Sequence, residues 1–278
     1  MDISQVLELW WVFPVSVCIA TVALSTGISG ALFFSPFFLI AVGLQPAQAI
    51  GAGLITELFG TSFASINYIR QRVIDYKTSR ALLMATVPAA IIGAYLAHRI
   101  EAGILQIVFG ISLALLAITV IYHSTQKNIQ PTSHVIEQAK NTTVLQSRDG
   151  NTYSYRTCNR PIGVSLAGIG AFLTGLISAG LPEITTTQLI IRCHIPPRVA
   201  VATSIFVLTV TVFFAAGVHA LSSQPAWHVV TWSVPGVIVG AQIGTRLQGK
   251  VPAHISERIL GSLFLAVGLL VVIIQVGL

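Results

Sequence analysis

The stretch SAGLPEITTTQLIIR, residues 178–192, places a proline, a glutamate, three threonines and a glutamine in a strongly apolar chain. The 278 residues are 54% hydrophobic and only 9% charged, whereas soluble domains carry roughly 25% charged residues. Apolar stretches of membrane-spanning length follow one another almost to the last residue. The composition therefore predicts an all-α polytopic membrane protein.

The apolar segments fall into two groups of five, separated by a polar linker. We expect membrane segments over residues 6–26, 31–44, 47–69, 81–98, 103–122, 161–179, 183–192, 197–221, 227–248 and 257–277. The linker, 123–160, contains Asp149-Gly150 between two strand-like runs, a signal for a β-hairpin. We expect three units: a membrane repeat over 1–122, the linker over 123–160, and a second membrane repeat over 161–278.

The two halves align with each other at one fixed register. A shift of 151 residues places Pro46 on Pro197 and Gly93 on Gly244. One register held over so long a span indicates an internal duplication. Five segments in each half would make the second half an inverted copy of the first, a plan common among secondary transporters.

The basic residues support this odd number of segments. With inverted halves, the loops 70–80, 123–160, 192–198 and 246–258 share one side of the membrane and hold all fifteen basic residues except Arg99. Because lysine and arginine gather in cytoplasmic loops, we expect the linker in the cytoplasm and both termini on the other side. The tally leaves open whether the first two segments of each half cross fully or form re-entrant hairpins.

Two of the apolar segments are too short to cross a membrane. Ten residue steps separate Pro182 from Arg192, and also Pro36 from Pro46, which gives a helix of about 15 Å in a hydrocarbon core of about 30 Å. Proline is favoured at the first position of a helix, so we expect Pro182 and Pro36 to begin half-helices near the midplane. Two helix N-termini that converge there would form an anion site.

Small and hydroxyl-bearing residues near these helix starts are the candidates for substrate binding. Capping and helix–helix hydrogen bonding are the alternative roles for Thr185, Thr186, Thr187 and Gln188. The candidates are Thr26, Gly27, Ser29, Gly30, Ser35, Ser178, Gly180, Thr185, Thr186, Thr187, Gln188, Thr203 and Ser204.

Two acids lie at membrane depth, and we expect both to take part in proton coupling. An intramembrane carboxylate is costly and tends to mark an ion or proton path. Glu183 has a structural alternative, since an acid in the first helical turn complements the helix dipole. Glu57 continues a stripe with Gly53 and Thr61 that suits tight helix packing, but packing does not explain the carboxylate.

Other classes of function find little support in the sequence. No zinc-protease, P-loop or nucleophile-elbow motif occurs, so we expect no enzyme activity, no metal and no cofactor. The net charge of +6 follows from the cytoplasmic loops and needs no nucleic-acid partner. The cysteines Cys18, Cys158 and Cys193 show no paired spacing, and we expect free thiols. The oligomeric state stays open, with a homodimer among the alternatives.

Paired motifs in the two halves resemble the TauE/SafE family of sulfite exporters. The first half carries GISGALFFSP followed by GLQPAQAIGAG, and the second carries TGLISAGLPE followed by IPPRVAVATS. The resemblance covers residues 15–120 and 161–277. It implies a bacterial inner-membrane transporter that exports sulfite or a small organosulfur anion such as sulfoacetate.

Two other functions remain open at this point. One is a transporter, for uptake or export, of another small anion such as thiosulfate or a carboxylate. The other is a membrane scaffold without transport activity, against which the buried acids argue, because a scaffold does not need them.

Overall fold

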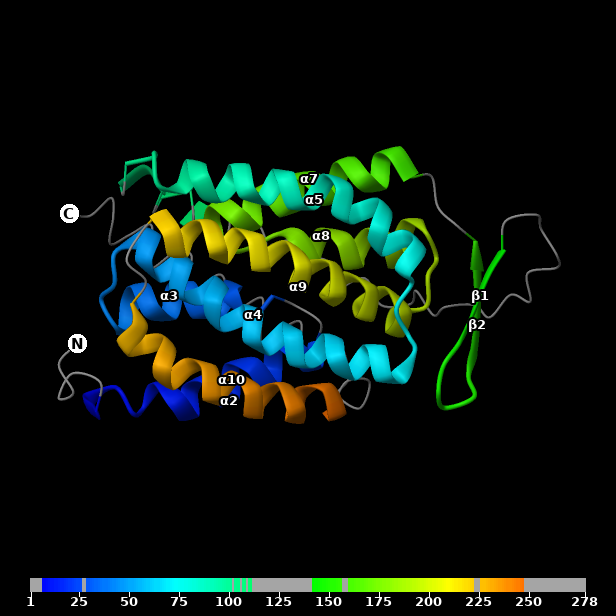
Figure 1. Ribbon diagram of the computed structural model, residues 1–278, viewed down its shortest axis with the longest axis horizontal. Helices are drawn as coiled ribbons and strands as arrows, with labels where there is room; N and C mark the ends of the chain where they lie inside the picture. Colours follow the sequence, from blue (N-terminus) through cyan, green and yellow to red (C-terminus); the bar gives the residue numbers. More distant parts are fainter. Residues whose placement is uncertain are drawn as a thin grey trace.

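The computed structural model describes residues 7–26, 29–101, 103–105, 107, 108, 110, 111, 142–156, 160–222 and 226–247. These residues form a bundle of helices with a small two-stranded sheet beyond one end (Figure 1). The helices are α2 Val12–Thr26, α3 Ala31–Ala41, α4 Pro46–Gln71, α5 Tyr76–Ala97, α7 Arg160–Ile177, α8 Leu181–Thr187, the π-helix η1 Gln188–Arg192, α9 Pro197–Ser222 and α10 Trp227–Leu247.

These helices lie where the hydropathy of the sequence predicts segments. The expected segments 103–122 and 257–277 lie wholly or mostly outside the described residues. Both α4 and α9 are 26 residues long and begin with a proline, Pro46 or Pro197. Proline suits this position because its missing N–H would have no partner in the first turn.

The two long helices form the centre of the bundle. α4 packs against α9, α5 packs against α9, and α10 packs against α4. α2 lies along α10 and α7 lies along α5 on the outside. On the outer surface Met84 is 78% exposed and Phe213 is 59% exposed, as expected of side chains that face lipid rather than water.

By length and composition, α4, α5 and α9 are each able to cross a membrane. Glycines bring the shorter pair α2 and α10 into close contact. A Cβ atom added to Gly236 or Gly240 would lie 2.6 Å from the carbonyl oxygen of Phe13 or Val17 on α2. Small residues at four-residue spacing are a common basis of helix packing in membranes. Apart from the two-stranded sheet, the described part of the chain is thus a helical membrane bundle.

Strands β1 Thr142–Gln146 and β2 Thr152–Arg156 form an antiparallel hairpin, in the stretch where the sequence indicates one. Tyr155 donates a hydrogen bond from its hydroxyl to Asp75 Oδ2 at 3.0 Å, just before α5. Burial and the neighbouring carboxylate raise the pKa of Tyr155, so this hydroxyl stays a donor. The hairpin is therefore fixed to the bundle.

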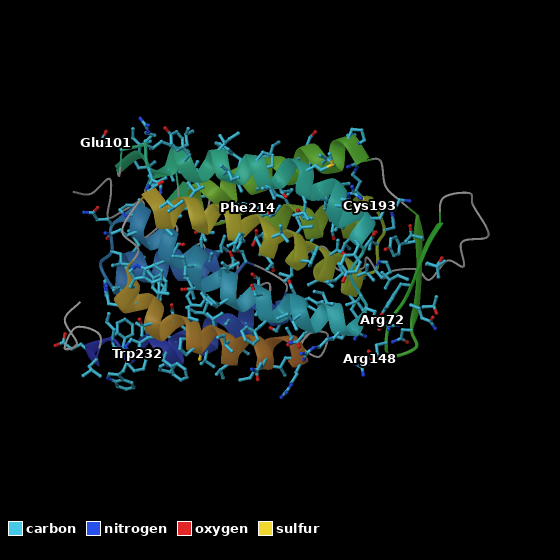
Figure 2. The ribbon with its side chains drawn as sticks, viewed as in Figure 1. Arg72, Glu101, Arg148, Cys193, Phe214 and Trp232 are labelled. Carbon is cyan, nitrogen blue, oxygen red and sulfur yellow. The ribbon has the colours of Figure 1, made fainter. Side chains whose placement is uncertain are left out.

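Basic residues occupy the hairpin end of the bundle. The C-terminal ends of α4 and α10 and the N-terminal ends of α5 and α9 lie there (Figure 1). These ends carry Arg70, Lys77, Arg80, Arg198 and Arg246. Arg72 and Arg148 lie at the same end, whereas Glu101 lies at the opposite end (Figure 2).

The prediction that Pro36 begins a helix is wrong. α3 begins at Ala31, and Pro36 lies inside it. The reason is a tertiary contact: Glu57 of α4 accepts a hydrogen bond from the N–H of Ala31 at 3.2 Å and so caps the helix there. Pro182 lies close to its expected position, as the second residue of α8, one residue after Leu181.

The expectation of three free thiols is wrong for Cys193, which is disulfide-bonded. Cys18 is a free thiol. Cys158 lies outside the described residues.

Candidate functional site

The start of α3 lies inside the bundle, against a carboxylate from α4. Ser29 and Ala31 are fully buried, and Glu57 is 2% exposed. Glu57 Oε1 accepts two hydrogen bonds, from the Ser29 hydroxyl at 2.5 Å and from the Ala31 N–H at 3.2 Å. Glu57 Oε2 is buried and has no hydrogen-bond partner among the described residues.

The start of α8 meets the start of α3 through one carboxylate. Glu183 Oε2 accepts a hydrogen bond from the N–H of Gly180 at 3.0 Å. Glu183 Oε1 accepts one from the N–H of Ser29 at 2.9 Å. The two helix starts therefore converge on a single carboxyl group, and backbone N–H groups at helix starts are donors that suit oxyanions.

Ser29 connects the two acids. Its N–H binds Glu183 while its hydroxyl binds Glu57. A change of charge at one acid thus alters the hydrogen bonding of the residue that holds the other. The sequence alone does not reveal this link, since it joins three separate segments.

A pair of serines closes the site beside these acids. The hydroxyls of Ser35 and Ser178 lie 2.5 Å apart, and the Ser178 hydroxyl is 3.5 Å from the carbonyl oxygen of Ala31. Gly53 of α4 faces Ser35 closely enough that a Cβ atom there would overlap the serine hydroxyl. Gly53 is thus required for α4 to approach α3.

The backbone before α8 is held in an unusual conformation. Ser178 has φ of 60° and Gly180 has φ of 122°. The Gly180 conformation favours glycine, because a side chain at such a φ is strained. Gly30, the equivalent residue before α3, has φ of −67° and needs no glycine for its backbone.

Other candidates lie around this centre. Ser204 of α9 donates a hydrogen bond to the carbonyl oxygen of Pro182 at 3.4 Å. The hydroxyls of Thr185 and Thr186 are buried and have no hydrogen-bond partner among the described residues. Gly27 and the side chain of Thr26 lie outside the described residues.

Three of the candidates point elsewhere. Thr203 accepts a hydrogen bond from the N–H of Asp75 at 3.0 Å, before α5. Gln188 donates to the carbonyl oxygen of Gly163 on α7 at 3.0 Å. Thr187 is exposed. The hydrogen bond of Gln188 corresponds to its alternative role of helix–helix hydrogen bonding, and that of Thr203 caps the start of α5. A role of these three residues in substrate binding stays a prediction.

Thr174 belongs to the site although it was not among the candidates. Its hydroxyl accepts a hydrogen bond from the N–H of Leu181, the first residue of α8, at 2.9 Å. The duplication contained the signal, because Thr174-Gly175 aligns with Thr26-Gly27 after a slip of three residues.

The fold and this site define an integral membrane protein with a polar centre, where the starts of α3 and α8 meet the carboxyl groups of Glu57 and Glu183. Groups of three or more potential metal ligands are absent from the described residues. The family model "Sulfite exporter TauE/SafE" matches residues 12–271. The chain belongs to this family.

Two curated relatives of the chain come from Bacillus subtilis (strain 168). The chain is 24% identical over 255 residues to "Probable membrane transporter protein YunE", a match that covers 89% of this chain and 91% of that protein. It is 23% identical over 240 residues to "Probable membrane transporter protein YjnA", which covers 81% and 86%. No solved structure matches the chain. Membrane transport is the activity that the names of the family and of both relatives share.

Proposed function

We propose that the protein exports sulfite or a small organosulfur anion across the bacterial inner membrane, coupled to protons through Glu57 and Glu183. The observation that carries this proposal is the Glu183 carboxylate, which accepts N–H groups from both Ser29 and Gly180. This carboxylate occupies the position in which two helix starts would hold a substrate oxyanion.

Recognition at this depth depends on dipoles rather than on fixed cations. The described lysines and arginines lie at or beyond helix ends. Backbone N–H groups and the hydroxyls of Ser29, Ser35 and Ser178 remain as donors. Such a site suits a small, strongly hydrated oxyanion that binds only moderately, as export requires.

The geometry also supports a role for protons. An entering anion has to replace Glu183 on the two N–H groups, and two negative charges about 4 Å apart repel by about 4 kcal/mol at an effective dielectric constant of 20. Protonation of Glu183 removes this repulsion and weakens its hold on the N–H groups. Ser29 transmits the change to Glu57, whose partner is the serine hydroxyl. Anion binding and proton uptake therefore favour each other.

We further propose that the halves are inverted repeats that rock around this site, in the manner of other secondary transporters. The reciprocal packing of α2 on α10 and of α7 on α5 supports this. So does the course of α3 and η1, which end at opposite ends of the bundle (Figure 1).

For the orientation we propose a cytoplasmic hairpin and periplasmic termini, supported by the arginines at the hairpin end. The disulfide of Cys193, at the same end, is more typical of an oxidising compartment. Thiol labelling of the hairpin turn decides between these two indications.

Flux into and out of proteoliposomes tests the proposed function. Sulfite, thiosulfate, sulfoacetate, taurine and acetate should each be offered with and without a pH gradient. We expect flux of sulfite or sulfoacetate that is faster when the side from which the anion leaves is the more acidic one. Selective flux of thiosulfate or acetate would assign another small-anion transporter, and absence of flux for every anion would favour the scaffold.

A further inference from the structure

A polar pocket lies at the hairpin end of the bundle, between the hairpin turn and the end of α4. Its volume is about 660 Å³, and it is lined by Ile69, Arg70, Arg72, Gln146, Ser147, Arg148 and Gly150. Three of these residues are arginines, and none is acidic. Arg70 is thirteen residues from Glu57 along α4, or about 20 Å, so the pocket is separate from Glu57.

The three arginines have no carboxylate partner among the described residues. The ion pair in this region joins Arg198 and Asp149 at 2.9 Å. Asp149, which follows Arg148 directly, is thus engaged by a residue of α9. Three guanidinium groups that surround one space repel one another, and a bound anion would relieve this repulsion.

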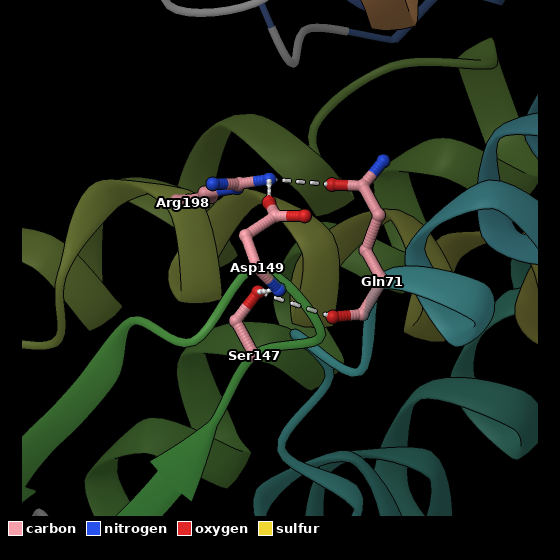
Figure 3. Close-up of polar contacts among 4 residues, drawn as sticks. All are labelled: Gln71, Ser147, Asp149 and Arg198. Carbon is pink, nitrogen blue, oxygen red and sulfur yellow. Dashed lines mark hydrogen bonds and ion pairs between the residues drawn. The ribbon is translucent and has the colours of Figure 1, made fainter.

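The pocket is held in place by hydrogen bonds around Gln71 (Figure 3). The carbonyl oxygen of Gln71 accepts the Arg148 N–H at 3.0 Å and the Ser147 hydroxyl at 3.2 Å. Its side-chain oxygen accepts a hydrogen bond from Arg198 at 2.8 Å. The hairpin therefore covers a carbonyl at the negative end of the α4 dipole, which would otherwise repel an anion.

Backbone geometry also fixes Arg72. This residue caps α4 in the left-handed conformation, with φ of 56°, and its N–H binds the carbonyl oxygen of Ile69 at 3.1 Å. Arg72 and Arg148 are both exposed and both belong to the hairpin end of the bundle (Figure 2). The structure thus holds the backbone while the guanidinium groups remain accessible.

We propose that this pocket binds a phosphate-type oxyanion, supplied either by the headgroup of an anionic phospholipid or by a free anion. The planar fork of arginine matches the oxygens of a phosphate group. Basic pockets at a membrane surface bind anionic headgroups. An oxyanion here joins α4 to the hairpin and, through Asp149 and Gln71, to Arg198 of α9. It therefore braces the ends of the two central helices.

The test uses the full-length protein in lipid nanodiscs, with thermal unfolding as the readout. One arm compares phosphatidylcholine discs with discs that contain phosphatidylglycerol. The other adds inorganic phosphate to phosphatidylcholine discs. We expect a rise in Tm in at least one arm. A rise with the lipid alone assigns the headgroup as the source, and a rise with phosphate alone assigns a free anion.

Matched variants locate the effect. The triple variant with Arg70→Gln, Arg72→Asn and Arg148→Gln should bind phosphate or phosphatidylglycerol more weakly. The concentration of that ligand that gives half of the Tm rise should increase by about tenfold or more, because each substitution removes a charge-assisted bond. Combined Lys77→Gln, Arg80→Gln and Arg246→Gln removes the same charge from exposed positions outside the pocket and should leave it unchanged. The single variant Arg148→Gln should raise the half-saturating concentration by a smaller factor. This variant keeps the test decisive if the triple variant fails to fold.

Two results would overturn the proposal. One is the absence of any Tm rise in both arms. The other is an equal loss in the pocket variant and the control variant, since that would mean a general effect of surface charge.

Discussion

The two acids of the candidate site should respond differently to replacement by glutamine. Glu183 accepts one N–H on each carboxylate oxygen, whereas a glutamine has only one acceptor oxygen and presents an NH₂ group to the second N–H. Glu57 accepts both of its hydrogen bonds on Oε1, so a glutamine there keeps them and places its NH₂ at the Oε2 position.

The magnitudes follow from this difference. Loss of one hydrogen bond to a charged group costs about 1.5–3 kcal/mol, so Glu183→Gln should lower the free energy of unfolding by that amount. Glu57→Gln should cost less than about 1 kcal/mol, because no hydrogen bond is lost. In Glu183→Gln the repulsion between carboxylate and substrate, about 4 kcal/mol at 4 Å, is absent. Sulfite should therefore bind at least roughly tenfold more tightly at neutral pH, where a factor of ten corresponds to about 1.4 kcal/mol.

Three measurements check this: thermal unfolding in detergent, sulfite affinity between pH 5 and pH 8, and flux into proteoliposomes under a pH gradient. Both variants should lose the response of flux to the gradient, and the affinity of Glu183→Gln for sulfite should depend less steeply on pH than that of the unchanged protein. The reasoning is refuted if Glu57→Gln is destabilised as much as Glu183→Gln. It is equally refuted if Glu183→Gln keeps both the affinity and the gradient response of the unchanged protein.

Three further predictions follow from glycines and from the hairpin turn. Gly180→Ala should lose about 1–3 kcal/mol of stability through backbone strain at φ of 122°, and most of the flux. Gly30→Ala, where a Cβ atom meets only ordinary contacts at 3.5 Å, should behave as the unchanged protein in the same unfolding and flux assays. Arg148→Cys in a background without native cysteines should react with an impermeant maleimide only after the cells are permeabilised, and labelling of intact cells would reverse the proposed orientation. Gly240→Leu should separate α2 from α10 and lower Tm. Gly217→Leu should leave Tm unchanged, because a Cβ atom there meets nothing within 4 Å. Equal Tm values for the two variants would contradict the packing argument.

The sequence predicts the helices well because hydropathy and helix-start signals are local. Proline marks the first residue of α4 and of α9, and Asp149-Gly150 lies at the hairpin turn. The start of α3 could not be predicted in this way, since Glu57 determines it from another helix. Local signals also fail for Thr203, which lies near the start of α9 but caps a segment 128 positions away in the chain.

Part of the geometry of the candidate site could be predicted from the sequence, whereas its individual contacts could not. Depth in the membrane and the converging helix starts can be estimated from residue counts. The contacts that connect Ser29 with both acids depend on how three elements pack, and a residue count does not contain that information. Only the tertiary structure shows that the N–H groups of the helix starts already hold carboxylates.

The two halves have comparable helix starts, but their acids lie at positions that are not equivalent. The shift of 151 residues that aligns the halves places Leu208 on Glu57, and both residues are buried. The duplicated scaffold thus supplies two comparable helix starts, while each half contributes its acid at a different position: Glu57 from α4, and Glu183 from α8 itself. A scaffold that needed only dipole complementation would place equivalent acids at equivalent helix starts. Under the proposed function the two acids therefore have different roles. Glu183 competes directly with the substrate for the N–H groups of both helix starts. Glu57 acts on the start of α3 through Ser29 and Ala31, the first residue of that helix. One acid then sets whether the anion can bind, and the other sets how firmly the start of α3 is held while it does.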